Sequence, residues 1–270
     1  MKILIPMAGE GKRFAEVGYK DSKPAIPTYD RRDMKKLPMV VCATMDLPGV
    51  KADGSNVIYV DRLFHREDGT EAAIREHFPR AEFISVDHLT EGQACTCLLA
   101  KDKIDNDEEL LIAGCDNGME LDTEIFEARR SQCDMMVFTY RHNDCVLANP
   151  NAHGWCVLKD GGPEIASMSV KKAISDTPME DHAVVATFWF KTGKLFVQAA
   201  ENMIKANDRI NNEFYVDQIV KYVLELGARA MVFEIDRYIS WGTPEDYEKY
   251  QKTFEYWKGF YEKERKLIEA

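Results

Sequence analysis

The stretch from Met1 to Phe14, MKILIPMAGEGKRF, constrains the chain more than any other segment. Residues 1–8 form a short apolar run rich in branched side chains, which predicts a buried strand. Gly9 and Gly11 follow and carry no Cβ, so the backbone there can turn sharply and come close to a ligand. A strand that passes through a glycine turn into a helix presents free N–H groups to phosphate. The sequence therefore predicts a phosphate-binding loop at these glycines.

Two cations follow the loop, and they can reach the same phosphates. Arg13 can form two parallel hydrogen bonds to a phosphate, and Lys23, in the pair Lys23-Pro24, acts as a point charge. Two familiar phosphate motifs are excluded. A dinucleotide fingerprint needs a third glycine where Phe14 stands, and a P-loop needs Ser or Thr after its Gly-Lys, where Arg13 follows Lys12.

The first half of the chain alternates between strand-like and helix-like segments, which favours a parallel α/β sheet. Strands are predicted at 56–60, 81–86, 110–113 and 135–140, and helices at 37–47, 69–78, 94–104 and 122–131. The second half begins with three strand-like runs that have no helix between them, which predicts antiparallel ribbons. These strands are predicted at 155–158, 165–172 and 184–190, followed by helices at 195–205 and 214–226 and a strand at 230–235.

A last helix is predicted after Gly242, with Thr243 as its N-cap and Pro244 at its first position. Aromatic residues then recur at steps of three and four, which places them on one helix face. This stripe consists of Tyr247, Tyr250, Phe254, Trp257 and Tyr261. We expect the face to dock on the domain, with a contact in a homodimer as the alternative.

Composition excludes several classes of function. The net charge of −11, with no local basic patch, argues against nucleic-acid binding. No apolar run is long enough to span a bilayer, and the N-terminus is a strand rather than a secretory leader. The seven cysteines are odd in number and scattered, which is typical of reduced thiols. We therefore expect a cytoplasmic protein without nucleic-acid or membrane partners.

A second candidate site follows the apolar run Leu110–Ala113. Asp116 comes just past the end of this predicted strand, where open α/β sheets bind ligands. Its carboxylate can hold Mg²⁺, which in turn bridges phosphate oxygens. The alternative is an ordinary turn, because Asn117-Gly118 is a common turn pair.

The N-terminal pattern Met-Ala-Gly-x-Gly-x-Arg-Phe, with Lys-Pro about ten residues later, resembles the opening of the sugar-phosphate nucleotidyltransferases. The resemblance implies that Met7, Ala8, Gly9 and Gly11 hold a nucleoside triphosphate. It further implies that Arg13 contacts the phosphates and that Lys23 neutralises charge at the reacting phosphorus. In this family the strand that matches 110–113 also ends in a metal-binding Asp, which implies a Mg²⁺ ligand at Asp116.

Three more segments carry the resemblance. The family segment similar to 90–96 faces the base, which implies that Gly92 and Gln93 bind the nucleotide. The alternative for Gln93 is a role in a capping box at the start of the helix, which would exclude contact with the base. A family lysine that binds the acceptor phosphate implies the same for Lys171, with a solvated basic pair as the alternative. Glu213 resembles an acceptor-binding carboxylate, and its alternative is a helix-start residue.

Near residue 242 the chain departs from the family. Many relatives have Asp-x-Gly-Thr there, and that Asp is the second Mg²⁺ ligand, but this chain has Ser240 in its place. Asp236 or Glu234, at the end of the preceding strand, could substitute. Otherwise water and the triphosphate complete the coordination of Mg²⁺.

The resemblance implies a Rossmann-like three-layer α/β fold with a mixed, mostly parallel sheet and a small antiparallel insertion. We expect one domain, with a nucleotide-binding half at 1–145, an acceptor-binding half at 146–243 and a C-terminal helix at 244–270. The expected function is Mg²⁺-dependent transfer of a nucleotide from an NTP to a sugar phosphate or another phosphorylated small molecule. CTP is favoured, and capsule or other surface-polysaccharide precursor synthesis is the expected role. The alternatives are a glycosyltransferase with a nucleotide-sugar donor and a non-catalytic nucleotide-binding regulator.

Overall fold

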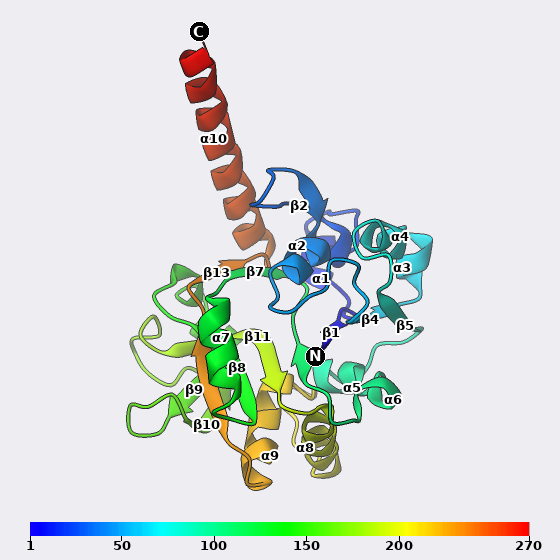
Figure 1. Ribbon diagram of the computed structural model, residues 1–270, viewed down its shortest axis with the longest axis vertical. Helices are drawn as coiled ribbons and strands as arrows, with labels where there is room; N and C mark the ends of the chain where they lie inside the picture. Colours follow the sequence, from blue (N-terminus) through cyan, green and yellow to red (C-terminus); the bar gives the residue numbers. More distant parts are fainter. Residues whose placement is uncertain (270) are drawn as a thin grey trace.

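The computed structural model describes residues 1–269 (Figure 1). The strands are β1 (Lys2–Pro6), β2 (Pro27–Tyr29), β3 (Lys36–Pro38), β4 (Val57–Arg62), β5 (Glu82–Val86), β6 (Leu110–Ile112), β7 (Asn117–Glu120), β8 (Met135–Tyr140), β9 (Gly154–Leu158), β10 (Ile165–Val170), β11 (His182–Phe190), β12 (Ala230–Glu234) and β13 (Arg237–Ser240). The helices are α1 (Lys12–Glu16), α2 (Met39–Met45), α3 (Phe64–Glu67), α4 (Thr70–Arg75), α5 (Gln93–Leu98), α6 (Lys101–Ile104), α7 (Thr123–Arg130), α8 (Gly193–Lys205), α9 (Ile219–Glu225) and α10 (Pro244–Glu269).

One large mixed sheet organises the chain. The strand β1 lies between β4 and β6 and is parallel to both, and β5 extends the sheet beyond β4, also in parallel. The long strand β11 runs antiparallel to β6, and β8 pairs with β11 and with β12. The predicted α/β class, with its parallel first half, is confirmed, and the parallel strands place their carboxyl ends along one edge.

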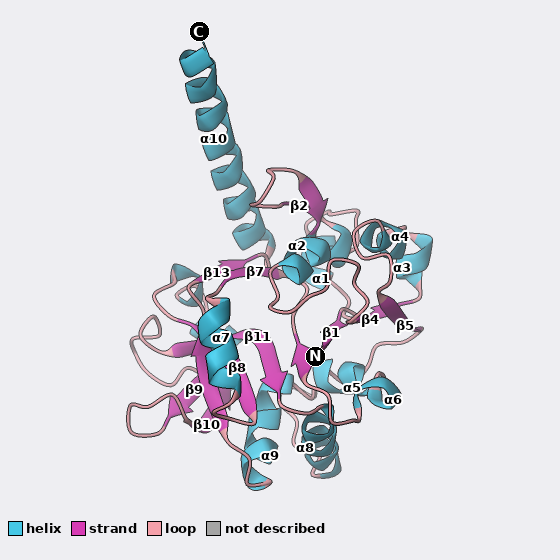
Figure 2. Ribbon diagram, in the orientation of Figure 1, coloured by secondary structure: helices cyan, strands magenta, loops and turns pink. Residues whose placement is uncertain are grey.

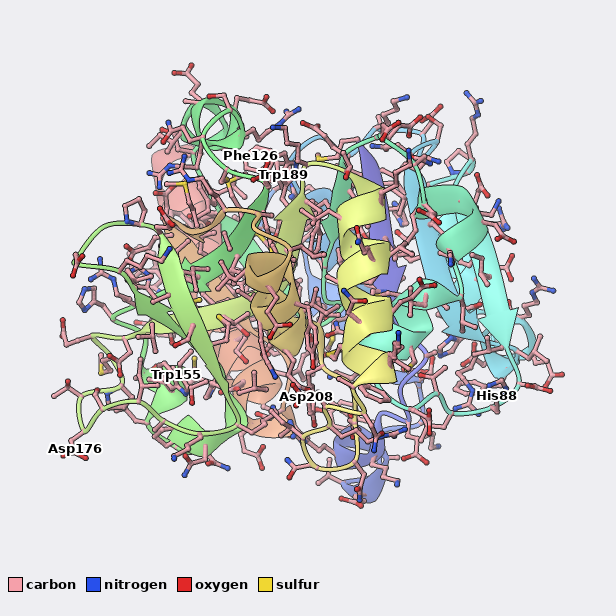
Figure 3. All side chains as sticks on the ribbon, turned by 90° about the horizontal axis from the view of Figure 1, so that it is seen from below. His88, Phe126, Trp155, Asp176, Trp189 and Asp208 are labelled. Carbon is pink, nitrogen blue, oxygen red and sulfur yellow. The ribbon has the colours of Figure 1, made fainter. Side chains whose placement is uncertain are left out.

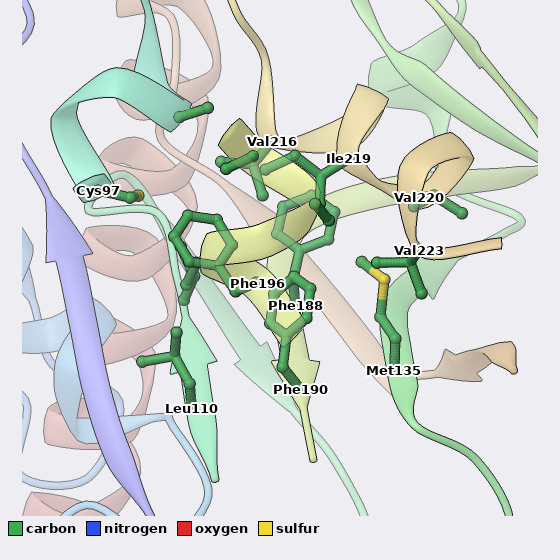
Figure 4. Packing of buried hydrophobic residues seen from close by; sticks show 14 of the residues in the cluster. Cys97, Leu110, Met135, Phe188, Phe190, Phe196, Val216, Ile219, Val220 and Val223 are labelled. Atoms are coloured by element: carbon green, nitrogen blue, oxygen red, sulfur yellow. The ribbon is translucent and has the colours of Figure 1, made fainter. Parts of the chain in front are cut away.

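Both faces of the sheet are buried, which explains why β1 is an apolar run without alternation. Leu4 faces one cluster, in which aromatic residues of β11 pack against α8, as Figure 4 shows for Phe188, Phe190 and Phe196. Ile3 faces the second cluster on the other side. Figure 3 labels Phe126 of α7 and Trp189 of β11, which both belong to that second cluster.

The predicted antiparallel insertion is also present. The strand β9 pairs antiparallel with β10 and with the start of β11. The register of β11 shifts between Val184 and Phe188, and Ala186 in this bulge has a φ of +58°. Its carbonyl accepts a hydrogen bond from Gly114 N at 3.1 Å. The bulge therefore brings β11 against the loop that carries Asp116.

Several local predictions were wrong. The sequence analysis missed two short ribbons, the antiparallel pairs β2–β3 and β7–β13. The single helix predicted at 94–104 is two helices, because α5 ends at Leu98 and α6 begins at Lys101. The predicted capping box is absent, since Gly92 is the N-cap of α5 and makes no side-chain cap. The hydroxyl of Thr90 instead bonds with Thr96 and with Gly92 O.

The helix α10 leaves the body of the molecule (Figures 1 and 2). Its first turns dock as predicted: Tyr247 is buried beside Phe14, and Phe254 stacks on Tyr29 with ring centroids 4.7 Å apart. The rest of the aromatic stripe is exposed, with Trp257 51% and Tyr261 59% accessible. Docking of the whole stripe on the domain was therefore a wrong prediction for its second half.

Two further expectations concern the environment of the chain. Among residues 1–269 the structure has no helix that combines the length and the hydropathy needed to cross a bilayer. All seven cysteines are free, and burial raises the pKa of several of these thiols, for example Cys42 to about 12 and Cys133 to about 11.

Candidate active site

The glycine loop begins where β1 ends at the carboxyl edge of the parallel strands. Met7 is buried in the second core cluster, so only its backbone can face a ligand. Gly11 has a φ of +63°, and a Cβ there would lie 3.3 Å from the Cβ of Lys23. The loop therefore packs directly against the segment that carries Lys23. Because α1 is a single turn, its dipole adds little, and the neighbouring cations carry most of the positive field.

The side chains of Lys23 and Asp116 meet across the site. Lys23 begins a 3-10 turn, Lys23–Ala25, and its Nζ lies 2.5 Å from Oδ2 of Asp116. Burial disfavours both charges, but each charge stabilises the other; the pKa of Lys23 is therefore raised and that of Asp116 lowered. The structure thus brings together the two residues that the sequence placed at the reacting phosphate and at the metal.

Arg13 is exposed on α1. Burial raises the pKa of Asp116, whereas Lys23 and, to a smaller extent, the charge of Arg13 lower it. This charge also adds to the effect of burial in lowering the pKa of Lys171. The charge of Arg13 therefore acts on side chains from both halves of the chain. A small cleft of about 250 Å³ has Arg13, Lys23 and Gly242 in its wall.

A larger cleft of about 500 Å³ opens on the other side of the loop. Gly92 fits here because a Cβ would lie 2.5 Å from the backbone N of Phe214. Without the predicted capping role, the side chain of Gln93 is available to the cleft. Residues of both halves line this cleft, including Ala8, Gly9, Gly92, Gln93, Thr96 and Glu213.

Lys171 lies at the end of β10 with a φ of +58°. Its Nζ donates to Ala152 O and lies 5.4 Å from the centroid of the Tyr215 ring. Burial lowers its pKa, while Asp217 and Glu213 act in the opposite direction. Asp217 was missed by sequence reasoning, and burial raises its pKa to about 6. The side chain of Lys171 is thus held by this chain's own groups, and it does not line either of the two clefts.

Asp236 is not brought to the site. In the β7–β13 ribbon Ser240 is opposite Asn117, next to Asp116, whereas Arg237 is opposite Glu120 at the far end. Asp236 precedes Arg237 and is exposed. Strands rise about 3.3 Å per residue, so the ribbon keeps Asp236 well away from Asp116. Its alternative, Glu234, is held by two of the guanidinium nitrogens of Arg141, Nε and Nη2, each at 2.8 Å.

The atoms around Asp116 that could coordinate a metal suit a hard divalent cation. They are oxygens: the carboxylate of Asp116, the amide of Asn117 and the hydroxyl of Ser240. The ammonium of Lys23 already occupies the position of a cation at Asp116. Among residues 1–269, however, no group of three or more His, Cys, Asp and Glu side chains could hold a metal ion. The residues present therefore fit Mg²⁺ that takes its other oxygens from phosphates and water.

The fold and the site define an α/β protein with a glycine loop and a facing Lys–Asp pair at the carboxyl ends of parallel strands. Comparison of the sequence with protein-family models and with curated proteins finds no match. Solved structures do match. The nucleoside-diphosphate-sugar pyrophosphorylase of Vibrio cholerae RC9 aligns with a TM-score of 0.70 and 16% identity, over 93% of this chain and 99% of the other.

Two more solved structures agree. A candidate glucose-1-phosphate thymidylyltransferase from Bacillus anthracis aligns with a TM-score of 0.69 and 17% identity, over 94% of this chain and 95% of the other. The inositol-1-phosphate CTP transferase of T. maritima aligns with a TM-score of 0.61 and 13% identity, over 91% and 90%. The chain therefore has the fold of the sugar-phosphate nucleotidyltransferases, and the resemblance noted in the sequence is confirmed at the level of the fold.

Proposed function

We propose that the protein is a nucleotidyltransferase that joins an NTP to a phosphorylated small molecule and releases pyrophosphate. The observation that carries this proposal is the pair Lys23–Asp116, which lies against the glycine loop with Arg13 nearby. Two cations and one carboxylate in this arrangement suit a triphosphate whose charge is redistributed during the reaction. The first half, residues 1–145, binds the nucleotide in this proposal, and residues 146–243 bind the acceptor.

In-line transfer needs little covalent chemistry from the protein. The acceptor phosphate attacks the α-phosphorus of the NTP, and pyrophosphate leaves with the bonding electron pair. Lys23 and Arg13 stabilise the negative charge that develops, and the loop N–H groups orient the phosphates. Lys171 is on the acceptor side, where its cation can hold the attacking phosphate. Glu213 lines the large cleft and can accept a hydrogen bond from a substrate hydroxyl.

Mg²⁺ is part of the proposal, with Asp116 as the carboxylate that holds it. The ion would neutralise charge on the phosphates of the bound NTP. Lys23 would then move from Asp116 to the phosphates, because the ion takes its place beside the carboxylate. The NTP itself would supply several of the oxygens that the protein lacks.

The preferred NTP in this proposal is CTP. Gln93 supports reading of a base, because its amide offers both a donor and an acceptor to the cleft. The acceptor is a sugar 1-phosphate or a small phosphorylated alcohol, and the product would serve capsule or other surface-polysaccharide synthesis. We also propose a homodimer through the exposed end of α10, which Trp257 and Tyr261 support.

The test is release of pyrophosphate with Mg²⁺, for each of CTP, UTP, dTTP, ATP and GTP against phosphorylated sugars, choline and amino-acid derivatives. Release that depends on one NTP and one acceptor is expected. Arg13→Ala should lower turnover at least a hundredfold, as loss of a transition-state donor does. Lys12→Ala is the matched control, since this exposed neighbour pairs with Glu10. Silence across the panel, with tight binding of a nucleotide-sugar, would instead indicate a glycosyltransferase or a regulator.

A further inference from the structure

The hollow beside Asp116 is bordered by the start of α10. A Cβ built on Gly242 would lie 3.3 Å from Oδ2 of Asp116 and 4.0 Å from Oγ of Ser240. These two oxygens therefore face the same small space. Gly242 leaves that space open, because any larger residue would place a carbon between them. The backbone holds this arrangement, since Trp241 N donates to Asp116 O at 3.0 Å.

A second carboxylate stands behind Ser240. Oγ of Ser240 donates a hydrogen bond to Oδ2 of Asp246 at 2.9 Å. Asp246 is in the first turn of α10, where its own N–H donates to Oγ of Thr243 at 3.2 Å. Because the hydroxyl proton of Ser240 points to Asp246, the oxygen of Ser240 can accept from or coordinate another group; the hydroxyl of Tyr238 is one neighbour that it already has.

Asp246 faces the interior of the site rather than solvent alone. Burial is the largest cause that raises the pKa of Tyr238, and the charges of Asp116 and Asp246 raise it further. Burial and the charge of Lys171 lower the pKa of His153, whereas the charge of Asp246 raises it. Both carboxylates therefore lie close enough to Tyr238 for their charges to act on its hydroxyl.

Asn117 brings a further oxygen close to Asp116. Its side chain is only 3% exposed. Its Oδ1 and Oδ1 of Asp116 would lie 3.1 and 3.3 Å from a Cβ at Gly114, so both oxygens point the same way. The amide oxygen of Asn117 therefore lies close to the carboxylate of Asp116 and is a further oxygen of the kind that a hard cation takes as a ligand.

We propose that Asp246 is the second acidic group of the divalent-cation site and that it acts through Ser240. Ser240 supplies the oxygen that faces the ion, and Asp246 supplies the negative charge one hydrogen bond farther away. The serine at position 240 then does not deprive the site of its second acidic group, because Asp246 of α10 supplies the carboxylate. This inference rests on the divalent-cation part of the proposed function and makes Asp246 a positioning residue.

The physical reason is the role of partners behind metal ligands. A carboxylate that accepts a hydrogen bond from a ligand orients that ligand and raises its electron density. Removal of such a partner costs about 10- to 100-fold in metal affinity. A serine hydroxyl alone is a weak ligand for a hard cation, so the charge behind it decides whether the ion binds.

The experiment measures binding of Mn²⁺ to the full chain by electron paramagnetic resonance. Asp246→Asn keeps an oxygen that accepts from Ser240 but removes the charge, and should weaken Mn²⁺ binding about tenfold. Glu245→Gln is the matched control: this exposed acid is in the same helical turn, so its loss changes the helix N-terminus equally. Its Mn²⁺ affinity should stay within about twofold of the wild type.

Rescue separates this role from a structural one. In the double variant Ser240→Asp with Asp246→Asn, a carboxylate is returned to position 240, and Mn²⁺ affinity should recover to near the wild-type value. Thermal melting of each variant shows whether it folds; if Asp246→Asn does not, Ser240→Ala provides the same test, with weakened binding expected.

Asp116→Asn distinguishes the two proposals. If Asp116→Asn abolishes Mn²⁺ binding while Asp246→Asn and Ser240→Ala bind as the wild type does, the role of Asp246 is refuted and the proposed function stands. If Asp116→Asn binds Mn²⁺ as well as the wild type, the cation site itself is refuted, and the role of Asp246 with it. Equal weakening by Glu245→Gln and Asp246→Asn would also refute it, because the effect would belong to the helix terminus.

Discussion

Gly92 joins the two halves of the large cleft, and Gly92→Ala is the sharpest test of the geometry there. Gly92 has a φ of +128° and a ψ of 173°, a backbone conformation open almost only to glycine, which costs another residue about 1–3 kcal/mol. The new Cβ would lie 2.5 Å from N and 2.7 Å from O of Phe214. These are backbone atoms, so no side chain can rotate away.

The contacts around Gly92 prevent easy relief. Phe214 N donates to Glu91 O at 2.9 Å, and Ala94 N donates to Phe214 O at 3.0 Å, so displacement of either segment breaks backbone hydrogen bonds. Overpacking of this kind costs about 1–3 kcal/mol. With the conformational cost, we expect Gly92→Ala to lower the free energy of unfolding by about 4 kcal/mol.

Urea unfolding, followed by circular dichroism and by tryptophan fluorescence, measures this loss. With a denaturant slope of about 3 kcal/mol per molar, the midpoint should fall by about 1.3 M. Gly259→Ala is the control: the site is open, and alanine in the interior of α10 should stabilise by up to about 1 kcal/mol. A loss below about 1 kcal/mol in Gly92→Ala would refute the close approach of the two segments.

Three more perturbations test other parts of the structure. Burial raises the pKa of Asp217 to about 6, so the native state binds this proton more tightly than the unfolded state does. The stability that the bound proton confers is present below about pH 4 and is lost as the pH rises to about 6. Asp217→Asn should therefore flatten the decline in the free energy of unfolding when it is measured across this pH range. Arg31→Ala removes one hydrogen bond to the carboxylate of Asp46, which is 2% exposed and keeps Arg32 and Met119 N as partners, and should cost about 2 kcal/mol in urea unfolding. Arg80→Ala, which breaks an exposed pair, should cost under about 0.5 kcal/mol. If α10 mediates a dimer, Trp257→Ser with Tyr261→Ser should yield monomers in analytical ultracentrifugation, while Tyr256→Ser, exposed outside the stripe, should not.

Most elements could be predicted because the local pattern and the tertiary environment agree. Residues 135–140 form β8 as predicted, since a strand buried on both faces must be apolar throughout. Asp122 caps α7 by accepting from the N–H groups of Glu124 and Ile125, a short-range signal that any N-cap search detects. The pairing of Lys23 with Asp116 was expected only through the family resemblance, because 93 residues separate them.

The errors arose where long-range contacts override local signals. Thr90 and Gln93 have the spacing of a capping box, but the hydroxyl of Thr90 bonds with Thr96 instead, because Gly92 turns the chain against residue 214. The strand β7 is too short and polar to be recognised, and it exists only because β13 pairs with it. Asp246 and Asp217 looked like ordinary helix-start acids, since nothing in the sequence shows what they face.

The β7–β13 ribbon explains how the C-terminal segment contributes to the candidate active site. It places Ser240 opposite Asn117 and lets Trp241 N bond to the carbonyl of Asp116. The loop after β6 could otherwise adopt many conformations, because glycines flank it on both sides. This contact joins residues that are more than a hundred positions apart in the sequence. The position of Asp116 therefore depends on the C-terminal segment. Trp241 lies just before Pro244, the first residue of α10, so the start of this helix is tied by a backbone hydrogen bond to Asp116.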